Sequence, residues 1–85
     1  MTEERFSGLS LPERTKWVYF NGEFITSIRY YVYKINLYMI EGFYVELFYH
    51  HTQDRIEKIE LLEAQSTRMK FYTDQIKLPA GLKAS

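Results

Sequence analysis

The sequence predicts a small α+β protein in which a three- or four-stranded antiparallel β-meander is flanked by an N-terminal and a C-terminal helix. Strand-forming runs separated by short turn sequences occupy residues 23–62, which is the pattern of a meander. Two serines that can cap helices, Ser10 and Ser66, stand on either side of these runs. The 85 residues are expected to form one domain, with an ordered core over about 10–78 and flexible ends at 1–8 and 80–85.

The first helix is expected over residues 11–21. Ser10 and Glu13 form a capping box, and Pro12 falls in the first turn, where its missing N–H costs nothing. Gly22 is expected to end the helix in the left-handed conformation. The aromatic and β-branched run at 17–20 also fits a strand, so that alternative stays open. The buried side of the helix would comprise Leu11, Trp17, Val18 and Phe20.

Residues 23–29 are rich in strand formers and predict a first strand, with residues 30–32 as a tight connection to the next. A single long bent strand over 24–40 is the alternative.

A β-hairpin over residues 33–49, with Gly42 in its turn, is predicted to be the central element. A two-residue loop of Glu41 and Gly42 leaves each face half polar. A three-residue loop that begins at Ile40 puts Gly42 at a left-handed bulge position and separates the faces, so we predict this longer loop. Both helices are expected to cover the resulting apolar face, which carries Tyr33, Ile35, Leu37, Met39, Phe43, Val45, Leu47 and Tyr49.

Residues 55–62 are predicted to form a strand that pairs with the hairpin, because Ile59 then lies opposite Val45 and Lys58 opposite Glu46. Glu57 is a misfit on the apolar face in this register. A long helix from residue 54 is the alternative. A second helix is expected over 67–77, between the cap at Ser66 and the stop at 79.

Composition argues against several classes of function. Eleven basic residues balance eleven acidic ones, which disfavours nucleic acid as a partner, and the absence of cysteine rules out a Cys-based metal site. The N-terminal residues contain no apolar signal core, and no run approaches the length of a membrane helix. We therefore expect a cytoplasmic protein with no membrane partner.

No catalytic, cofactor-binding or metal-binding residues are predicted, and the protein is expected not to be an enzyme. His50 and His51 are adjacent in a strand, so their side chains point to opposite faces and do not converge on a metal. The glycines are scattered rather than clustered in a phosphate-binding loop, and no serine lies in a nucleophile elbow.

The second face of the predicted sheet is the candidate contact surface. Aromatic rings interleaved with polar groups are typical of protein interfaces, and a small domain gains stability by self-association. We therefore predict a protein–protein interaction module, expected to be a homodimer, and as the alternative a binder of a small ligand or single-stranded nucleic acid through the same rings. The predicted contact face consists of Lys34, Asn36, Tyr38, Tyr44, Glu46, Phe48 and Lys58.

The sequence also resembles a group of short bacterial single-domain proteins with no assigned function. The resemblance rests on Gly22 and Phe24 after the first helix, on residues 33–38 (YKINLY) and 42–46 (GFYVE), and on Ile56 and Ile59. It covers about residues 11–78 and implies a complete natural domain. It implies no activity, cofactor or catalytic residue.

Overall fold

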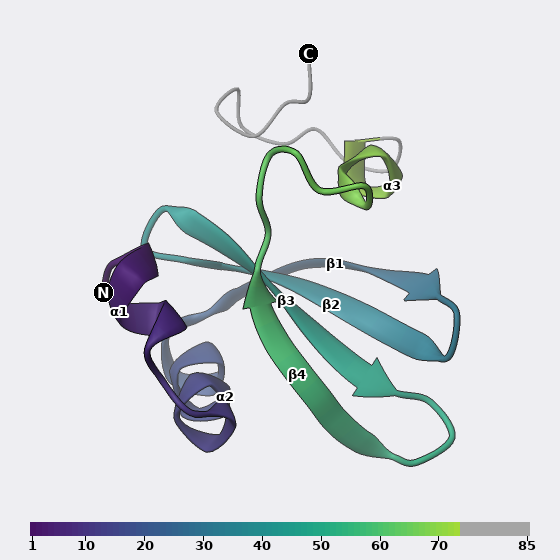
Figure 1. The fold of residues 1–85 in the computed structure, drawn as a ribbon, viewed down its shortest axis with the longest axis horizontal. Helices are drawn as coiled ribbons and strands as arrows, with labels where there is room; N and C mark the ends of the chain where they lie inside the picture. The colour runs from purple at the N-terminus through teal and green to yellow at the C-terminus, as the bar shows by residue number, and fades with distance from the viewer. Residues whose placement is uncertain (74–85) are drawn as a thin grey trace.

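The computed structural model describes residues 1–73 and confirms the predicted α+β class. A four-stranded antiparallel sheet has the strand order β1-β2-β3-β4, so that each strand pairs with its neighbour in sequence (Figure 1). Helices precede and follow the sheet. The elements are α1 (Glu3–Ser7), α2 (Leu11–Asn21), β1 (Glu23–Tyr30), β2 (Tyr33–Ile40), β3 (Phe43–His50), β4 (Arg55–Leu61) and α3 (Met69–Thr73).

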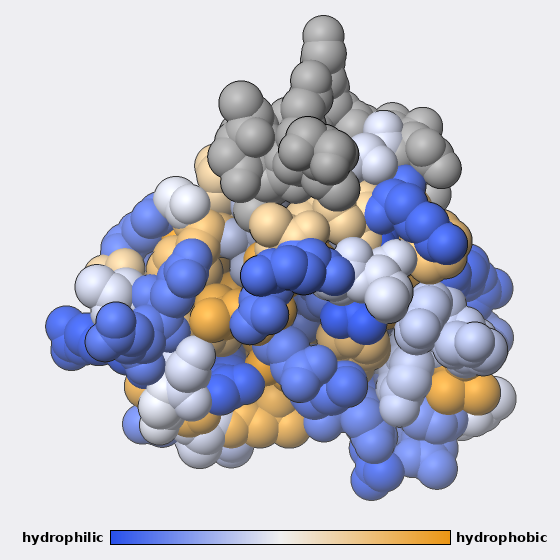
Figure 2. Space-filling model, turned by 45° about the horizontal axis from the view of Figure 1, so that its top comes forward, coloured by the Kyte–Doolittle hydropathy of each residue, from blue (hydrophilic) through white to orange (hydrophobic). Residues whose placement is uncertain are grey.

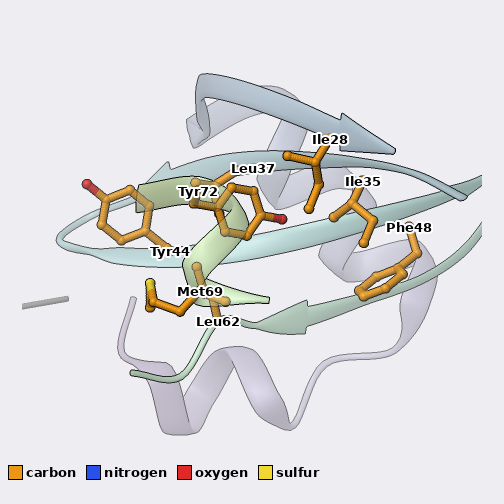
Figure 3. Packing of buried hydrophobic residues seen from close by; sticks show 8 residues of the cluster. All are labelled: Ile28, Ile35, Leu37, Tyr44, Phe48, Leu62, Met69 and Tyr72. Carbon is orange, nitrogen blue, oxygen red and sulfur yellow. The ribbon is translucent and has the colours of Figure 1, made fainter. Parts of the chain in front are cut away.

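Helices cover both faces of the sheet, and two hydrophobic clusters result. On the face that we call the helix-pair face, Phe6 of α1 and Val18 of α2 pack against Val45, Leu47 and neighbouring residues. On the opposite face, the α3 face, Met69 and Tyr72 of α3 pack against Ile28, Ile35, Leu37, Tyr44, Phe48 and Leu62 (Figure 3). The prediction that both helices cover one face is therefore wrong.

The register of the central hairpin differs from the predicted one. Ile40 lies directly opposite Phe43, so the loop has two residues. Glu41 and Gly42 both have positive φ angles, 45° and 95°, as a type I′ turn requires. The prediction of a three-residue loop is wrong because it assumed that one face of the sheet stays in water. Both faces are covered here, so separation of polar from apolar residues does not decide the register.

The strand prediction for residues 55–62 is confirmed over 55–61, but its register is shifted. Ile59 lies opposite Leu47 and Lys58 opposite Phe48, rather than opposite Val45 and Glu46. A bulge near Glu57 leaves that residue without a cross-strand partner, and its side chain is exposed. The bulge removes the misfit that Glu57 causes in a regular strand.

A second bulge, at Ile25, interrupts the pairing of β1 with β2. The strand predicted over 23–29 is confirmed, and a two-residue turn of Tyr31 and Val32 separates it from β2, so the long bent strand over 24–40 is excluded. Tyr31 has a φ of 55°, which is unusual for an aromatic residue.

The capping box of α2 is present, since Ser10 and Glu13 exchange hydrogen bonds. Gly22 follows the helix but has a φ of −82°, so it is extended rather than left-handed. A Cβ there would lie 2.6 Å from the Val18 carbonyl oxygen, and this close approach is what requires glycine. Phe20, predicted to be buried, is 83% exposed.

The ends of the chain differ from the prediction where the structure describes them. Residues 3–7 form α1 instead of a flexible arm, because the Phe6 side chain is fully buried and packs edge-on against Phe43. The second predicted helix, over 67–77, is present as α3 at Met69–Thr73. Residues 67 and 68 form a turn before the helix, and the predicted helical residues 74–77 and the flexible end at 80–85 lie outside the described part of the chain.

Candidate functional site

The residues of the predicted contact face do not lie together. Tyr44, Glu46, Phe48 and Lys58 lie on the α3 face, whereas Lys34, Asn36 and Tyr38 lie on the helix-pair face. The one-residue change in register moves all of the β3 members to the other side of the sheet. Tyr44 and Phe48 are 5% and 2% exposed, because α3 and its neighbours pack over them. The prediction of an open aromatic face is therefore corrected.

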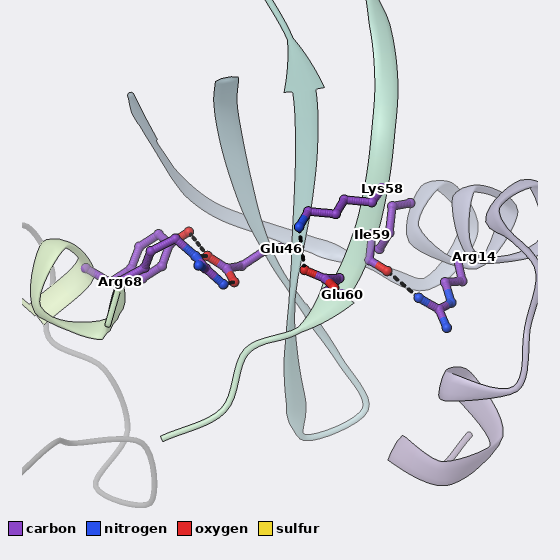
Figure 4. Close-up of polar contacts among 7 residues, drawn as sticks. Arg14, Glu46, Lys58, Ile59, Glu60 and Arg68 are labelled. Atoms are coloured by element: carbon purple, nitrogen blue, oxygen red, sulfur yellow. Dashed lines mark hydrogen bonds and ion pairs between the residues drawn. The ribbon is translucent and has the colours of Figure 1, made fainter. Parts of the chain in front are cut away.

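The most concentrated polar chemistry is a buried carboxylate, Glu46, in the middle of β3. It is fully buried, and Arg68 donates to it from Nε at 2.8 Å and from Nη2 at 2.7 Å (Figure 4). The Tyr72 hydroxyl donates a third hydrogen bond at 2.8 Å. The predicted partner, Lys58, instead pairs with Glu60 at 3.1 Å. A buried charge is costly unless it is paired, and three donors satisfy this one.

Aromatic rings complete the surroundings of this ion pair. The Arg68 guanidinium lies 5.2 Å from the Phe48 ring centre and 5.7 Å from that of Tyr30, and Lys58 Nζ lies 4.6 Å from the Phe48 ring centre. The hydrogen bonds to Glu46 raise the pKa of Arg68, so it stays charged. Burial, followed by the charge of Glu46, raises the pKa of the Tyr72 phenol, which therefore remains a donor. The cluster holds α3 against the sheet.

The two histidines lie where β3 leads into its turn toward β4. His50 Nδ1 accepts a hydrogen bond from the Gln53 N–H at 3.1 Å, inside the turn between β3 and β4. The backbone N–H of His51 donates to the Val32 carbonyl at 2.9 Å. Within residues 1–73 no group of three or more His, Cys, Asp or Glu side chains is placed to hold a metal ion.

Hollows in the surface of the described residues are lined mainly by polar groups. The larger, of about 510 Å³, is lined by both charge signs, including Arg14, Arg68, Glu60 and Glu63. Its arginines are already engaged, since Arg14 donates to three backbone carbonyls and Arg68 is bound to Glu46. Figure 2 shows one face of the molecule, on which hydrophilic residues lie across the middle with hydrophobic ones visible between them. A smaller hollow, of about 370 Å³, is lined by Ser27, Ile28, Arg29, Lys34 and His51.

Exposed hydrophobic side chains form the feature that the sequence did not reveal. All the large ones among the described residues lie on β1 or directly beside it, and we call this set the β1 rim. Phe24 packs edge-on against Tyr38, with 5.6 Å between the ring centres. At the other end of the strand, the ring centres of Phe71 and Tyr30 are 6.2 Å apart. The β1 rim consists of Tyr19, Phe20, Phe24, Tyr31, Val32 and Phe71.

The signal for part of this rim was present in the sequence but had another interpretation. The run at 17–20 predicts a buried helix side, yet only Val18 of that run is fully buried. Burial raises the pKa of Tyr38, and the Tyr19 phenol adds to the rise. Helical spacing alone does not determine which side of a short helix faces the sheet.

Comparison with models of protein families, with curated proteins and with solved structures gives no match. None of the helices in residues 1–73 is long and apolar enough to cross a membrane. A function for this chain therefore rests on its fold and on the geometry of its surface.

Proposed function

We propose that this protein is a non-enzymatic interaction module that associates with a second copy of itself through the β1 rim. The observation that carries the proposal is the position of the exposed hydrophobic side chains. In the described part of the chain they form two groups, one at the start and one at the end of a single strand, β1, instead of being scattered. Grouped hydrophobic residues on a surface mark interaction sites, whereas single scattered ones need no explanation.

The individual residues support the same conclusion. Phe20 is 83% exposed and Tyr31 is 89% exposed, so neither ring contributes much to the core. Tyr31 also has a φ of 55°, a backbone conformation that glycine or asparagine would adopt with less strain. A large apolar side chain that adds neither core packing nor backbone stability is accounted for by contact with another molecule.

The alternative function, stacking of a small ligand or of nucleic-acid bases, loses its support. It depended on open rings at Tyr44 and Phe48, and both are buried. The formal net charge of the chain is zero, so the chain as a whole has no net electrostatic attraction to phosphates. The contact surface moves from the predicted sheet face to the β1 rim, while the interaction function is retained.

Sedimentation velocity on the wild type and on a Phe20→Ser/Tyr31→Asn double variant tests the proposal. We expect the wild type to be dimeric at ~100 µM, where mass action favours association. The double variant should weaken the dimer by roughly tenfold or more, because large aromatic residues dominate interface energetics. Both substituted side chains are exposed, so the circular dichroism spectrum should not change.

Glu57→Ser is the matched control, since Glu57 is exposed on β4, at the other edge of the sheet. It should leave the sedimentation profile as it is. A wild type that remains monomeric at ~100 µM would contradict the proposal.

A further inference from the structure

We infer that the second copy docks by adding its own β1 antiparallel to β1, with the two-fold axis passing beside Ser27. The two four-stranded sheets then join into one continuous sheet. This inference rests on the proposed self-association and adds the partner segment, the direction and the register. Three independent features support it: the chemistry of the two sheet edges, the side-chain alternation along β1, and the groups that the register brings together.

The two edge strands differ in how they are protected. In β4, four of the seven residues are charged, namely Arg55, Glu57, Lys58 and Glu60. Both edge strands pair through a bulge, so charge is what distinguishes them. Charges on an edge strand discourage pairing with another chain. In β1, residues 24–28 carry no charge, and the strand has eight residues. Edge-to-edge pairing is therefore disfavoured at β4 and open at β1.

Alternation along β1 limits the possible registers to those in which one residue lies on the two-fold axis. Thr26 and Ile28 lie opposite Leu37 and Ile35 on the α3 face, so Ser27 between them points to the helix-pair face. A two-fold axis perpendicular to the sheet keeps each side chain on the same face in both copies. Directly opposite residues also share a face, so the residue on the axis lies opposite its own copy. With Ser27 on the axis, Thr26 faces Ile28 of the second copy.

The bulge at Ile25 determines the pairs beyond Thr26. It shifts the alternation by one residue, so Phe24 lies on the helix-pair face, opposite Tyr38. Counting past the bulge, Phe24 of one copy lies opposite Arg29 of the other, on the same face. Arg29 and Lys34 are directly opposite in the β1–β2 pair and line the hollow of about 370 Å³ together with Ser27.

The second copy supplies what this hollow lacks. Within residues 1–73 neither Arg29 nor Lys34 makes an ion pair, and two like charges directly opposite in a sheet are unfavourable. Phe24 of the second copy brings an aromatic ring beside Arg29, where a cation–π contact is favourable. Among the registers that the alternation allows, the one centred on Ser27 gives Arg29 this partner, and we infer that register for this reason.

The ends of the strand are also complementary. Tyr19 and Phe20 are exposed just before β1, and Tyr31 and Val32 are exposed just after it. Antiparallel pairing places the start of each β1 beside the end of the other. At both ends of the paired strands, Tyr19 and Phe20 of one copy then lie beside Tyr31 and Val32 of the other.

A single cysteine tests the register, because the chain contains no cysteine of its own. In a Ser27→Cys variant the two thiols of a dimer face each other, at a Cα separation of about 4.5–5.5 Å that suits a disulfide. Mild oxidation at ~100 µM should therefore convert most of the protein to a covalent dimer on a non-reducing gel. The matched control is Lys58→Cys, which places an exposed thiol on β4 and should give little dimer.

Hydrogen exchange on the wild type provides a second measurement that needs no substitution. Backbone amides of β1 should gain protection between ~5 µM and ~100 µM, whereas those of β4 should not. A protein that dimerises without the Ser27→Cys cross-link and without concentration-dependent protection of β1 overturns this inference and leaves the proposed function standing. A protein that stays monomeric overturns both.

Discussion

The two faces of the sheet are closed by different means. On the helix-pair face, the buried members are all hydrophobic: Phe6, Val18, Ile40, Phe43, Val45, Leu47 and Ile59. On the α3 face, hydrophobic residues surround a charged centre, in which Glu46 is held by Arg68 and Tyr72. The first face is covered by two helices, α1 and α2, and the second by the five residues of α3.

This difference indicates two ways of attaching a helix. Apolar burial is strong but non-directional, so α1 and α2 are held mainly by the area that they remove from water, to which Arg14 of α2 adds a hydrogen bond to the Ile59 carbonyl. The described residues of α3 bury two side chains, Met69 and Tyr72, and the ion pair beside them adds a contact of defined geometry. A buried ion pair adds little net stability compared with a well-packed apolar group, so its main effect here is to fix where α3 lies. Substitutions on the two faces test this contrast.

The largest effect is expected for Phe6→Ala, on the apolar face. The Phe6 side chain is fully buried, and its removal leaves a cavity beneath α1. The free energy of unfolding should fall by about 3–5 kcal/mol, much of the total for a domain of this size. Urea denaturation followed by circular dichroism measures it. Arg5→Ala, at an exposed position of the same helix, is the control and should change the free energy by less than about 0.5 kcal/mol.

Arg68→Met tests the charged face. It leaves the Glu46 carboxylate buried without its cation and should lower the free energy of unfolding by about 3 kcal/mol. The same urea denaturation measures the loss. The matched control, Arg55→Met, breaks the exposed pair with Glu57 and should cost at most about 1 kcal/mol.

A further substitution shows whether the cost is due to the orphaned charge. Glu46→Gln in the Arg68→Met background makes the buried side chain neutral and should recover part of the lost stability. If the double variant is less stable than Arg68→Met alone, packing rather than charge determines how α3 is held.

Tyr72→Phe is expected to have a smaller effect than Phe6→Ala or Arg68→Met, since it removes only one of the three hydrogen bonds to Glu46. The cost should be about 1.5–3 kcal/mol. The raised pKa of Tyr72 stabilises the fold at pH values below the usual tyrosine pKa of 10.0. That contribution is lost as the pH rises above 10.0, because the unfolded phenol ionises first. Stability should therefore fall less steeply in Tyr72→Phe than in the wild type.

Tyr44→Phe is the matched comparison for Tyr72→Phe. Burial also raises the pKa of Tyr44, but its hydroxyl makes no hydrogen bond to Glu46. The Tyr44 variant should lose less stability at neutral pH than Tyr72→Phe. Equal losses would show that the third hydrogen bond to Glu46 contributes nothing measurable.

The amino-acid sequence by itself determined the features that depend on neighbouring residues. The capping box at Ser10 and Glu13 acts within one helical turn, and the structure contains it. The strands at 23–30 and 55–61 follow from β-branched and aromatic content, and the antiparallel order follows from the short turns between them. Gly42 marks the hairpin turn because it accepts a positive φ.

Only the tertiary structure decided the register, the faces and the site. Arg68 lies 22 residues from Glu46 in the chain, and no local pattern connects them. The register has a two-residue turn because helices bury both faces of the sheet. The charged partner of Glu46 is therefore Arg68, directly before α3, rather than water or Lys58. The exposure of the β1 rim was also decided by the tertiary structure, because the free energy of burial is summed over segments that are distant in sequence. No helix in residues 1–73 covers that edge of the sheet.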